Sequence, residues 1–205
     1  MKALLASGKG GGIKFDPAGH DGDISVFSED TVQTILGPQD NLIDLLVTTA
    51  EYDKTGLRRV LQDHDVSQLE TAISTFLTID FFSHEPETTM LVAGLQPQFD
   101  VQVSYKDKVD RFFIKEVKEN AVSITIDVFY PLPDKIIYLG KATIPLKNLV
   151  EEARPGRPPV LHTNAPIYAA EASVSIGFLN YQLRFRELIY EALSDFEKQT
   201  EILEK

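Results

Sequence analysis

The sequence predicts an all-β fold: an antiparallel β-sandwich of about eight strands with a helical insertion and a C-terminal helix. The main observation is the strict alternation of apolar and polar residues over positions 122–128 (VSITIDV), the period of two that a half-buried strand needs. Other short apolar runs are separated by segments rich in Gly, Pro and charged residues. The final twenty residues change to a helical period. The length of 205 residues suits one sandwich domain with extensions.

The predicted elements follow one another from position 41. Residues 56–73 change period, because Leu57, Leu61 and Leu69 fit one helical face better than a strand. Segment 111–117 (RFFIKEV) is short and amphiphilic and is compatible with a strand or a helical turn. The predicted strands cover residues 41–52, 74–82, 88–95, 100–105, 122–130, 136–144 and 172–185.

Three positions are predicted to end or bend strands. Pro131 and Pro133 remove backbone donors, so the strand before them must end in a loop. Gly140, inside the next apolar run, indicates a bend or bulge. In the closing strand the apolar parity changes after Phe178, which predicts either a bulge near Gly177 or burial on both faces.

The domain organisation predicted is a flexible tail over residues 1–39, a sandwich over 40–185 and an amphipathic helix over 186–205. The glycine run at 7–12 (SGKGGG) is typical of a linker, since it lacks the strand, the Lys-Ser/Thr pair and the helix of a phosphate-binding loop. In the C-terminal helix Ile189, Leu193 and Phe196 share one stripe. That stripe either packs back on the sandwich or is offered to another protein.

Charge and composition exclude several functions. The formal net charge is −11, which argues against binding to nucleic acid or nonspecifically to anionic lipid. The chain has no cysteine, which fits a reducing compartment and excludes disulfides and thiolate metal sites. It has no run of about 18 apolar residues and no signal-peptide pattern. We therefore expect a cytoplasmic protein.

The sequence offers no catalytic, cofactor-binding or metal-binding residues, and we expect neither a cofactor nor a small-molecule substrate. The four histidines are scattered, and His64 between Asp63 and Asp65 lacks the convergent ligands of a transition-metal site. The pair Glu151-Glu152 is best explained as solvated charge. Segment 155–159 (PGRPP) is a surface loop or, alternatively, a proline-rich ligand for a groove-binding domain.

The strand–loop–strand unit at 121–146, which ends in Gly-Lys-Ala-Thr-Ile-Pro-Leu, resembles the sixth and seventh strands of C2 domains. In calcium-binding members of that family two aspartates follow an aromatic residue at the loop. Here the aromatic position falls on Phe129 and the acidic positions on Tyr130 and Leu132. Asp134 alone cannot supply the six to eight oxygens that Ca²⁺ prefers, and Asp127 is expected to point to a sheet face. The resemblance therefore implies a C2-like sandwich without a calcium site.

A narrower resemblance covers about residues 41–190. Segments 75–82 (TFLTIDFF), 94–99 (GLQPQF), 111–125 and 175–186 resemble the C2 domains of the RPGR-interacting protein and fantom family of ciliary scaffolds. Gln96 stands where that family carries a histidine, and the coiled coils typical of those scaffolds are absent. The chain is therefore either a fragment of a larger scaffold or a small relative.

This resemblance implies a calcium-independent protein-interaction scaffold in a cilium or flagellum. The location implied is the transition zone, basal body or axoneme, and the partners implied are other ciliary or cytoskeletal proteins. We expect the contacts to involve the sheet edges, the tail before Asn41 or the helix after Phe185.

The alternative is a peripheral membrane C2 domain that binds phosphoinositides. Neighbouring acids nearly cancel the local field of its candidate cations, so we expect membrane binding to be unfavourable. Those cations are Lys106, Lys108, Arg111, Lys115 and Lys118.

Overall fold

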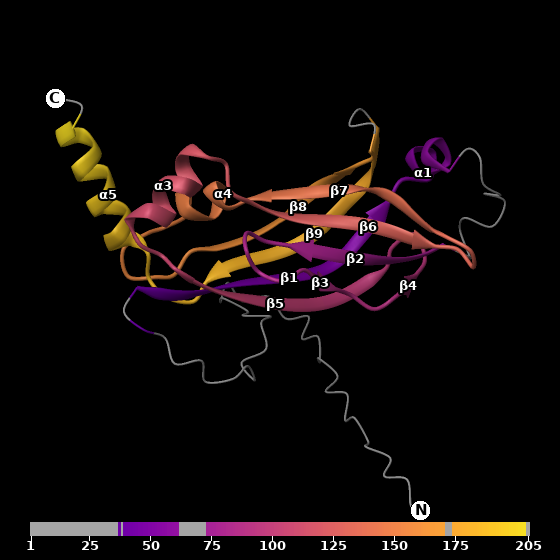
Figure 1. The fold of residues 1–205 in the computed structure, drawn as a ribbon, viewed down its shortest axis with the longest axis horizontal. Helices are drawn as coiled ribbons and strands as arrows, with labels where there is room; N and C mark the ends of the chain where they lie inside the picture. The colour runs from indigo at the N-terminus through magenta and orange to yellow at the C-terminus, as the bar shows by residue number, and fades with distance from the viewer. Residues whose placement is uncertain (1–36, 38, 62–72, 171–173, 204–205) are drawn as a thin grey trace, which may run out of the picture. The chain divides into compact units, whose positions relative to one another are not determined.

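The computed structural model describes residues 37, 39–61, 73–170 and 174–203 (Figure 1). Every described residue belongs to one compact unit, which lies within residues 32–205. The strands are β1 (Asp40–Tyr52), β2 (Ser74–Asp80), β3 (Glu87–Thr88), β4 (Val92–Ala93), β5 (Gln98–Lys108), β6 (Ser123–Pro131), β7 (Ile136–Pro145), β8 (Val160–Tyr168) and β9 (Ser175–Phe185). The helices are α1 (Lys54–Val60), α3 (Arg111–Glu119), α4 (Leu146–Glu151) and α5 (Tyr190–Leu203).

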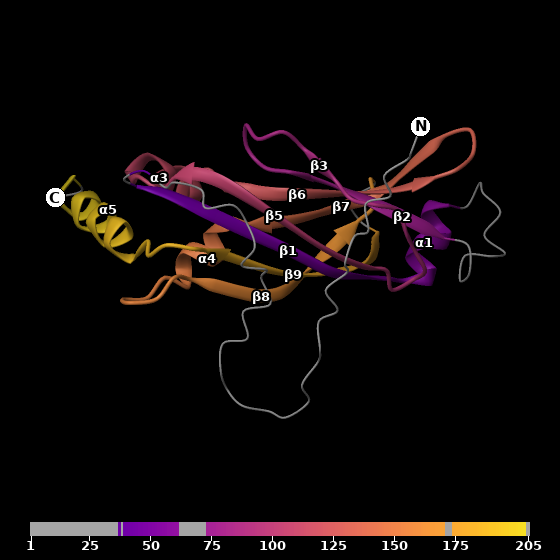
Figure 2. The same cartoon turned by 90° about the horizontal axis from the view of Figure 1, so that it is seen from below.

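The strands form two facing antiparallel layers, which confirms the predicted sandwich. The hydrogen-bonded order is β3-β2-β6-β7-β8-β9-β1-β5, with β4 also paired to β2. Strands β7 and β8 share only two residue pairs, so the order bends there into a layer of β2, β6 and β7 and a layer of β8, β9, β1 and β5 (Figure 2).

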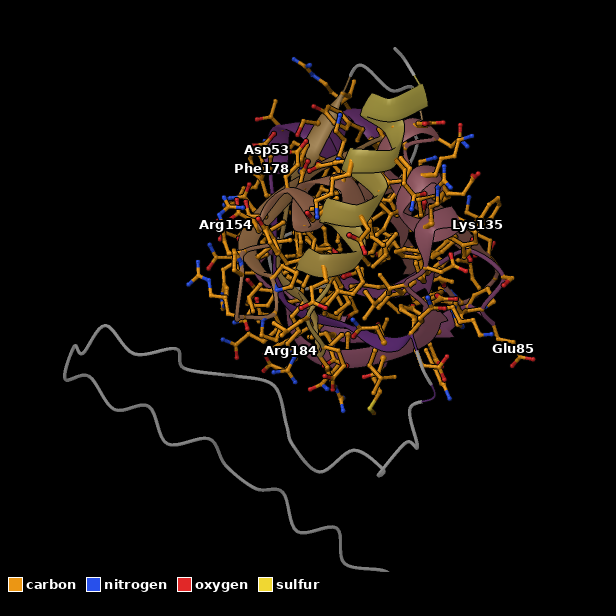
Figure 3. The ribbon with its side chains drawn as sticks, turned by 90° about the vertical axis from the view of Figure 1, so that its left-hand side faces the viewer. Asp53, Glu85, Lys135, Arg154, Phe178 and Arg184 are labelled. Atoms are coloured by element: carbon orange, nitrogen blue, oxygen red, sulfur yellow. The ribbon has the colours of Figure 1, made fainter. Side chains whose placement is uncertain are left out.

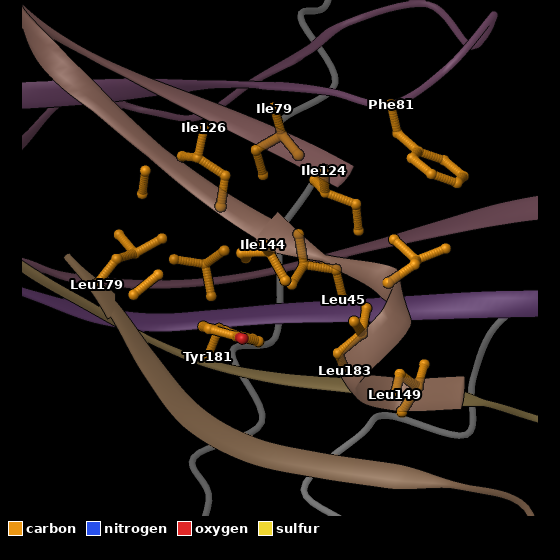
Figure 4. Close-up of a cluster of buried hydrophobic side chains, with 14 of the residues drawn as sticks. Leu45, Ile79, Phe81, Ile124, Ile126, Ile144, Leu149, Leu179, Tyr181 and Leu183 are labelled. Carbon is orange, nitrogen blue, oxygen red and sulfur yellow. The ribbon is translucent and has the colours of Figure 1, made fainter. Parts of the chain in front are cut away.

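The apolar core fills the space between the layers. Alternate residues of β6, such as Ile124 and Ile126, are fully buried and face Leu45 of β1 and Leu183 of β9 (Figure 4). The predicted period of two is therefore the inward face of each strand.

Bulges occur beside both glycines that the sequence singles out. The pairing of β6 with β7 shifts next to Gly140, and the pairing of β8 with β9 shifts next to Gly177. Because of the second shift, Ile176 and Leu179 are both buried whereas Phe178 is 49% exposed. The bulge is thus the correct one of the two predicted explanations, and the grouping of Phe178 with Ile176 on one face is wrong.

Helices cover the ends of the sandwich. Segment 111–117 is helical in α3, because the Asp110 side chain accepts a hydrogen bond from Phe113 N at 2.9 Å and so caps the first turn. The predicted helical insertion begins two residues early, in α1, which ends at Val60; residues 62–72 lie outside the described residues. None of the helices among the described residues is long and apolar enough to cross a membrane.

Helix α5 packs back on α3. Its residues Leu193 and Phe196 are buried, and Glu197 accepts a hydrogen bond from Lys118 Nζ at 2.6 Å. The Lys118 ammonium also lies 5.7 Å from the centre of the Phe196 ring. The apolar stripe of this helix is therefore used within the domain.

Two strand predictions need correction. The single strand predicted over 88–95 is two short strands, β3 and β4, with residues 89–91 between them unpaired to β2 as a ladder. Strand β8 was not predicted, because its only buried residues are Ala165 and Ile167 and most of its other side chains are polar or exposed.

Candidate functional site

The loop between β6 and β7 is the part of the fold that decides whether a calcium site exists. It is a tight turn in which Leu132 N donates a hydrogen bond to Lys135 O at 2.7 Å. Tyr130 and Leu132 are half-buried, and Asp134, the loop's one carboxylate, is exposed. Ligands for a hard cation would have to come from elsewhere.

Asp127 is directed away from the loop tip, as predicted. It lies on the outer face of β6, opposite Lys141 of β7, and accepts a hydrogen bond from Tyr138 Oη at 3.1 Å. Burial, together with the charge of Asp127, raises the pKa of the Tyr138 hydroxyl to about 12. Throughout the part of the chain that the structure describes, no group of three or more His, Asp or Glu residues is placed to hold a metal ion.

The remaining candidates for chemistry are apart from one another. His84, after β2, bonds Asp107 of β5 at 2.9 Å and stacks on Phe81. Glu151 is exposed and lies 3.9 Å from Lys147. His162 is exposed on β8. The Asp63-His64-Asp65 triplet and His20 lie outside the described residues.

Most of the cations predicted for phosphoinositide binding already face carboxylates. Lys106 Nζ lies 2.9 Å from Asp40, and Lys115 Nζ lies 3.7 Å from Glu119. Lys118 is bound to the C-terminal helix, as described above. The five cations thus do not form one exposed basic cluster.

The two ends of the strand order differ in how they meet solvent. At the β2 end, β3 and β4 are interrupted by Thr89, whose Oγ1 accepts a hydrogen bond from Leu77 N at 2.9 Å. Met90, in the same interruption, is 85% exposed. A short, broken strand of this kind blunts the edge against further pairing.

The β5 end is long and regular by contrast. Strand β5 has 11 residues and pairs along its inner side with β1. No strand within the described ranges pairs with its outer side. This edge is therefore the part of the sheet that can accept another strand.

A buried carboxylate organises the outer face of β1, β5 and β9. Asp44 is fully buried and accepts hydrogen bonds from Ser104 of β5 at 2.6 Å and from Arg184 of β9 at 2.9 Å. Arg186, immediately after β9, binds both carboxylate oxygens at 2.7 and 3.0 Å. Figure 3 shows Arg184 at the surface, on a different side of the domain from Lys135 of the β6–β7 loop.

These hydrogen bonds decide the charge of Asp44. Burial opposes its ionisation, but the hydrogen bonds from the two arginines and Ser104 outweigh burial and hold its pKa below the usual range. The sequence analysis missed this network. The available signal was an aspartate inside the apolar run 42–47 and two arginines at alternate positions, 184 and 186.

A family model described as the first C2 domain of RPGR-interacting protein 1 matches residues 33–188, well over half of the chain. No curated protein is significantly similar in sequence.

Solved structures share the fold at low sequence identity. The structure described as "CC2D1B coordinates ESRCT-III activity during the mitotic reformation of the nuclear envelope" is similar with a TM-score of 0.55 and 14% identity, over 77% of this chain and 59% of that one. The present chain thus spans less than two thirds of its length. A C2 domain-containing protein from a putative elicitor-responsive gene gives a TM-score of 0.48 and 12% identity, over 72% of this chain and 89% of that one. A structure of the two consecutive C2 domains of Extended-Synaptotagmin 2 gives 0.49 and 14%, over 78% and 45%.

Proposed function

Because this chain belongs to the family of the first C2 domain of RPGR-interacting protein 1, we propose that it is a calcium-independent C2 domain that binds other proteins in a ciliary assembly. C2 families are generally non-catalytic binding domains, which supports a binding role rather than an enzymatic one. The ciliary location rests on the resemblance to ciliary scaffolds described above.

One observation carries the calcium independence: the β6–β7 turn places half-buried Tyr130 and Leu132 where carboxylates would be needed. Asp134 is the single acid of this loop, and Asp127 is held on the sheet face by Tyr138. One exposed carboxylate does not replace the hydration shell of Ca²⁺.

Thermal unfolding of the full chain with and without calcium tests this proposal. We expect the same Tm in chelator and at about 1 mM Ca²⁺, the weak end of protein calcium sites. A rise in the Tm of the wild type that Asp134→Asn abolishes would contradict calcium independence.

The interaction role has a separate test. We expect the tagged chain to retain the same protein partners in calcium and in chelator. Recovery of membrane lipid in place of protein partners would instead favour the peripheral membrane alternative.

A further inference from the structure

The outer face of β1, β5 and β9 carries a local excess of positive charge at the end where β5 finishes. Register places Lys106 and Lys108 of β5 on the same face as Arg184 and Arg186. The carboxylates on that face are Asp40 and Asp44, so four cations stand against two acids. The excess is unusual for a chain with a net charge of −11.

The two carboxylates are already fully used by this arrangement. Asp44 is buried under the guanidinium groups. Asp40 is shared, because its hydrogen bond to Lys106 and the charges of Lys106 and Lys108 together hold its pKa below the usual range. The patch therefore has capacity for further negative charge without losing its internal contacts.

The same residues have backbone groups directed at the open edge. Val109 N donates to Gln39 O at 2.8 Å, so this pair is hydrogen-bonded, and in an antiparallel ladder such pairs alternate. The odd-numbered residues of β5 consequently bond to β1. The donor and acceptor groups of the even-numbered residues, including Ser104, Lys106 and Lys108, point away from β1 toward the edge.

We propose that the edge of β5 binds an extended segment of a partner protein that carries acidic residues at every second position. The segment would add a strand beside β5, and its acidic side chains would lie opposite Ser104, Lys106 and Lys108 on the outer face. Arg186 reaches this row as well, since its Nη2 lies 3.5 Å from Ser104 Oγ. The inference rests on the proposed role in protein binding and names the surface and the partner's chemistry.

Charge favours a strand over a membrane as the occupant. An anionic bilayer is a wide plane and brings many acidic residues of this −11 chain within reach of its own charge. A single strand contacts only the basic row, because salt screens more distant charges beyond about 8 Å.

Fluorescence anisotropy with the full chain tests the proposal. The probe is a labelled ten-residue peptide of alternating Glu and Thr. A peptide of the same composition with its five Glu in one block is the control for spacing. We expect the alternating peptide to bind more tightly, and we expect Lys106→Glu/Lys108→Glu to raise its Kd at least about tenfold. The charge-matched control Lys135→Glu/Lys147→Glu, on exposed residues away from β5, is expected to change the Kd less than about twofold.

A second variant separates the strand from the charge. Gln102→Pro removes a donor directed at the edge but leaves every charge of the patch in place, and we expect it to weaken the alternating peptide. Circular dichroism confirms that each variant is folded.

Several outcomes would overturn the proposal. Binding that ignores the Lys106/Lys108 reversal, or that is equal for the two peptides, would refute the edge site. Binding of vesicles containing phosphatidylserine in place of either peptide would assign the patch to membranes. If partners of the wild-type chain are still captured by Lys106→Glu/Lys108→Glu, the edge site fails while the protein-binding role stands.

Discussion

At the scale of single residues, the buried carboxylate of Asp44 fixes the position of the first strand. It links β1 to Ser104 on one side and to the two arginines on the other. Each of the two arginines is itself shielded, with side-chain exposures of 19% for Arg184 and 22% for Arg186. A buried ion network of this kind is costly to break, because the remaining charges lose their compensation.

We therefore predict that Asp44→Asn lowers the free energy of unfolding by about 2–4 kcal/mol, since two guanidinium groups lose their counter-ion. Chemical denaturation at neutral pH measures this. Asp134→Asn, at an exposed loop position, is the control and is expected to change stability by less than about 0.5 kcal/mol. Equal effects of the two substitutions would contradict the structural role of Asp44.

The same network predicts a pH dependence. Because the pKa of Asp44 in the folded chain lies below its ordinary value of 3.8, the folded state favours the ionised form. This contribution is present above about pH 4 and is lost as the pH falls through the lower, folded-state pKa. We expect the free energy of unfolding of the wild type to fall more steeply below pH 4 than that of Asp44→Asn. Parallel stability curves for the two proteins would show that Asp44 is not the titrating group.

At the scale of elements, the bulges place backbone of one strand against backbone of its neighbour. Gly177 has φ +146°, and a Cβ there would collide with the carbonyl of Glu51 in β1. Neither the angle nor the contact can be relieved by a flexible side chain. The glycine is thus required by the pairing of β9 with β1.

Gly177→Ala is accordingly predicted to lower the Tm by more than Gly156→Ala. Gly156 also has a positive φ, +79°, but no heavy atom lies within 4 Å of its added Cβ. Backbone strain alone costs about 1 kcal/mol, so the difference between the two variants measures the steric contact. Thermal unfolding monitored by circular dichroism gives both values, and a Gly156→Ala shift as large as that of Gly177→Ala would refute the argument.

The elements also show where sequence patterns suffice. The alternation in β6 and the glycines of the bulges predicted strands that the structure contains. The pattern failed for β8, because its register is set by pairing with β9 along its whole length and only two of its side chains are buried. Segment 111–117 stayed ambiguous because the decisive interaction is the cap supplied by Asp110, just outside it.

At the scale of the whole molecule, the candidate site illustrates a further limit of sequence analysis. The sequence identified the loop that lacks acids, since its residues are contiguous. The basic patch combines Lys106 and Lys108 with Arg184 and Arg186, about 80 positions apart, and only the neighbouring of β5, β1 and β9 brings them together. The candidate cations predicted from residues 106–118 were grouped by sequence distance, and the fold separates them onto a strand and a helix.

The claim that connects these scales is that this C2 domain binds proteins of a ciliary assembly without calcium. Proximity labelling with the tagged full chain in ciliated cells, in calcium and after chelation, tests that claim most directly. We predict the same set of labelled basal body, transition zone or axonemal proteins under both conditions. Labelling that is confined to proteins of other compartments, or that disappears on chelation, would contradict the account.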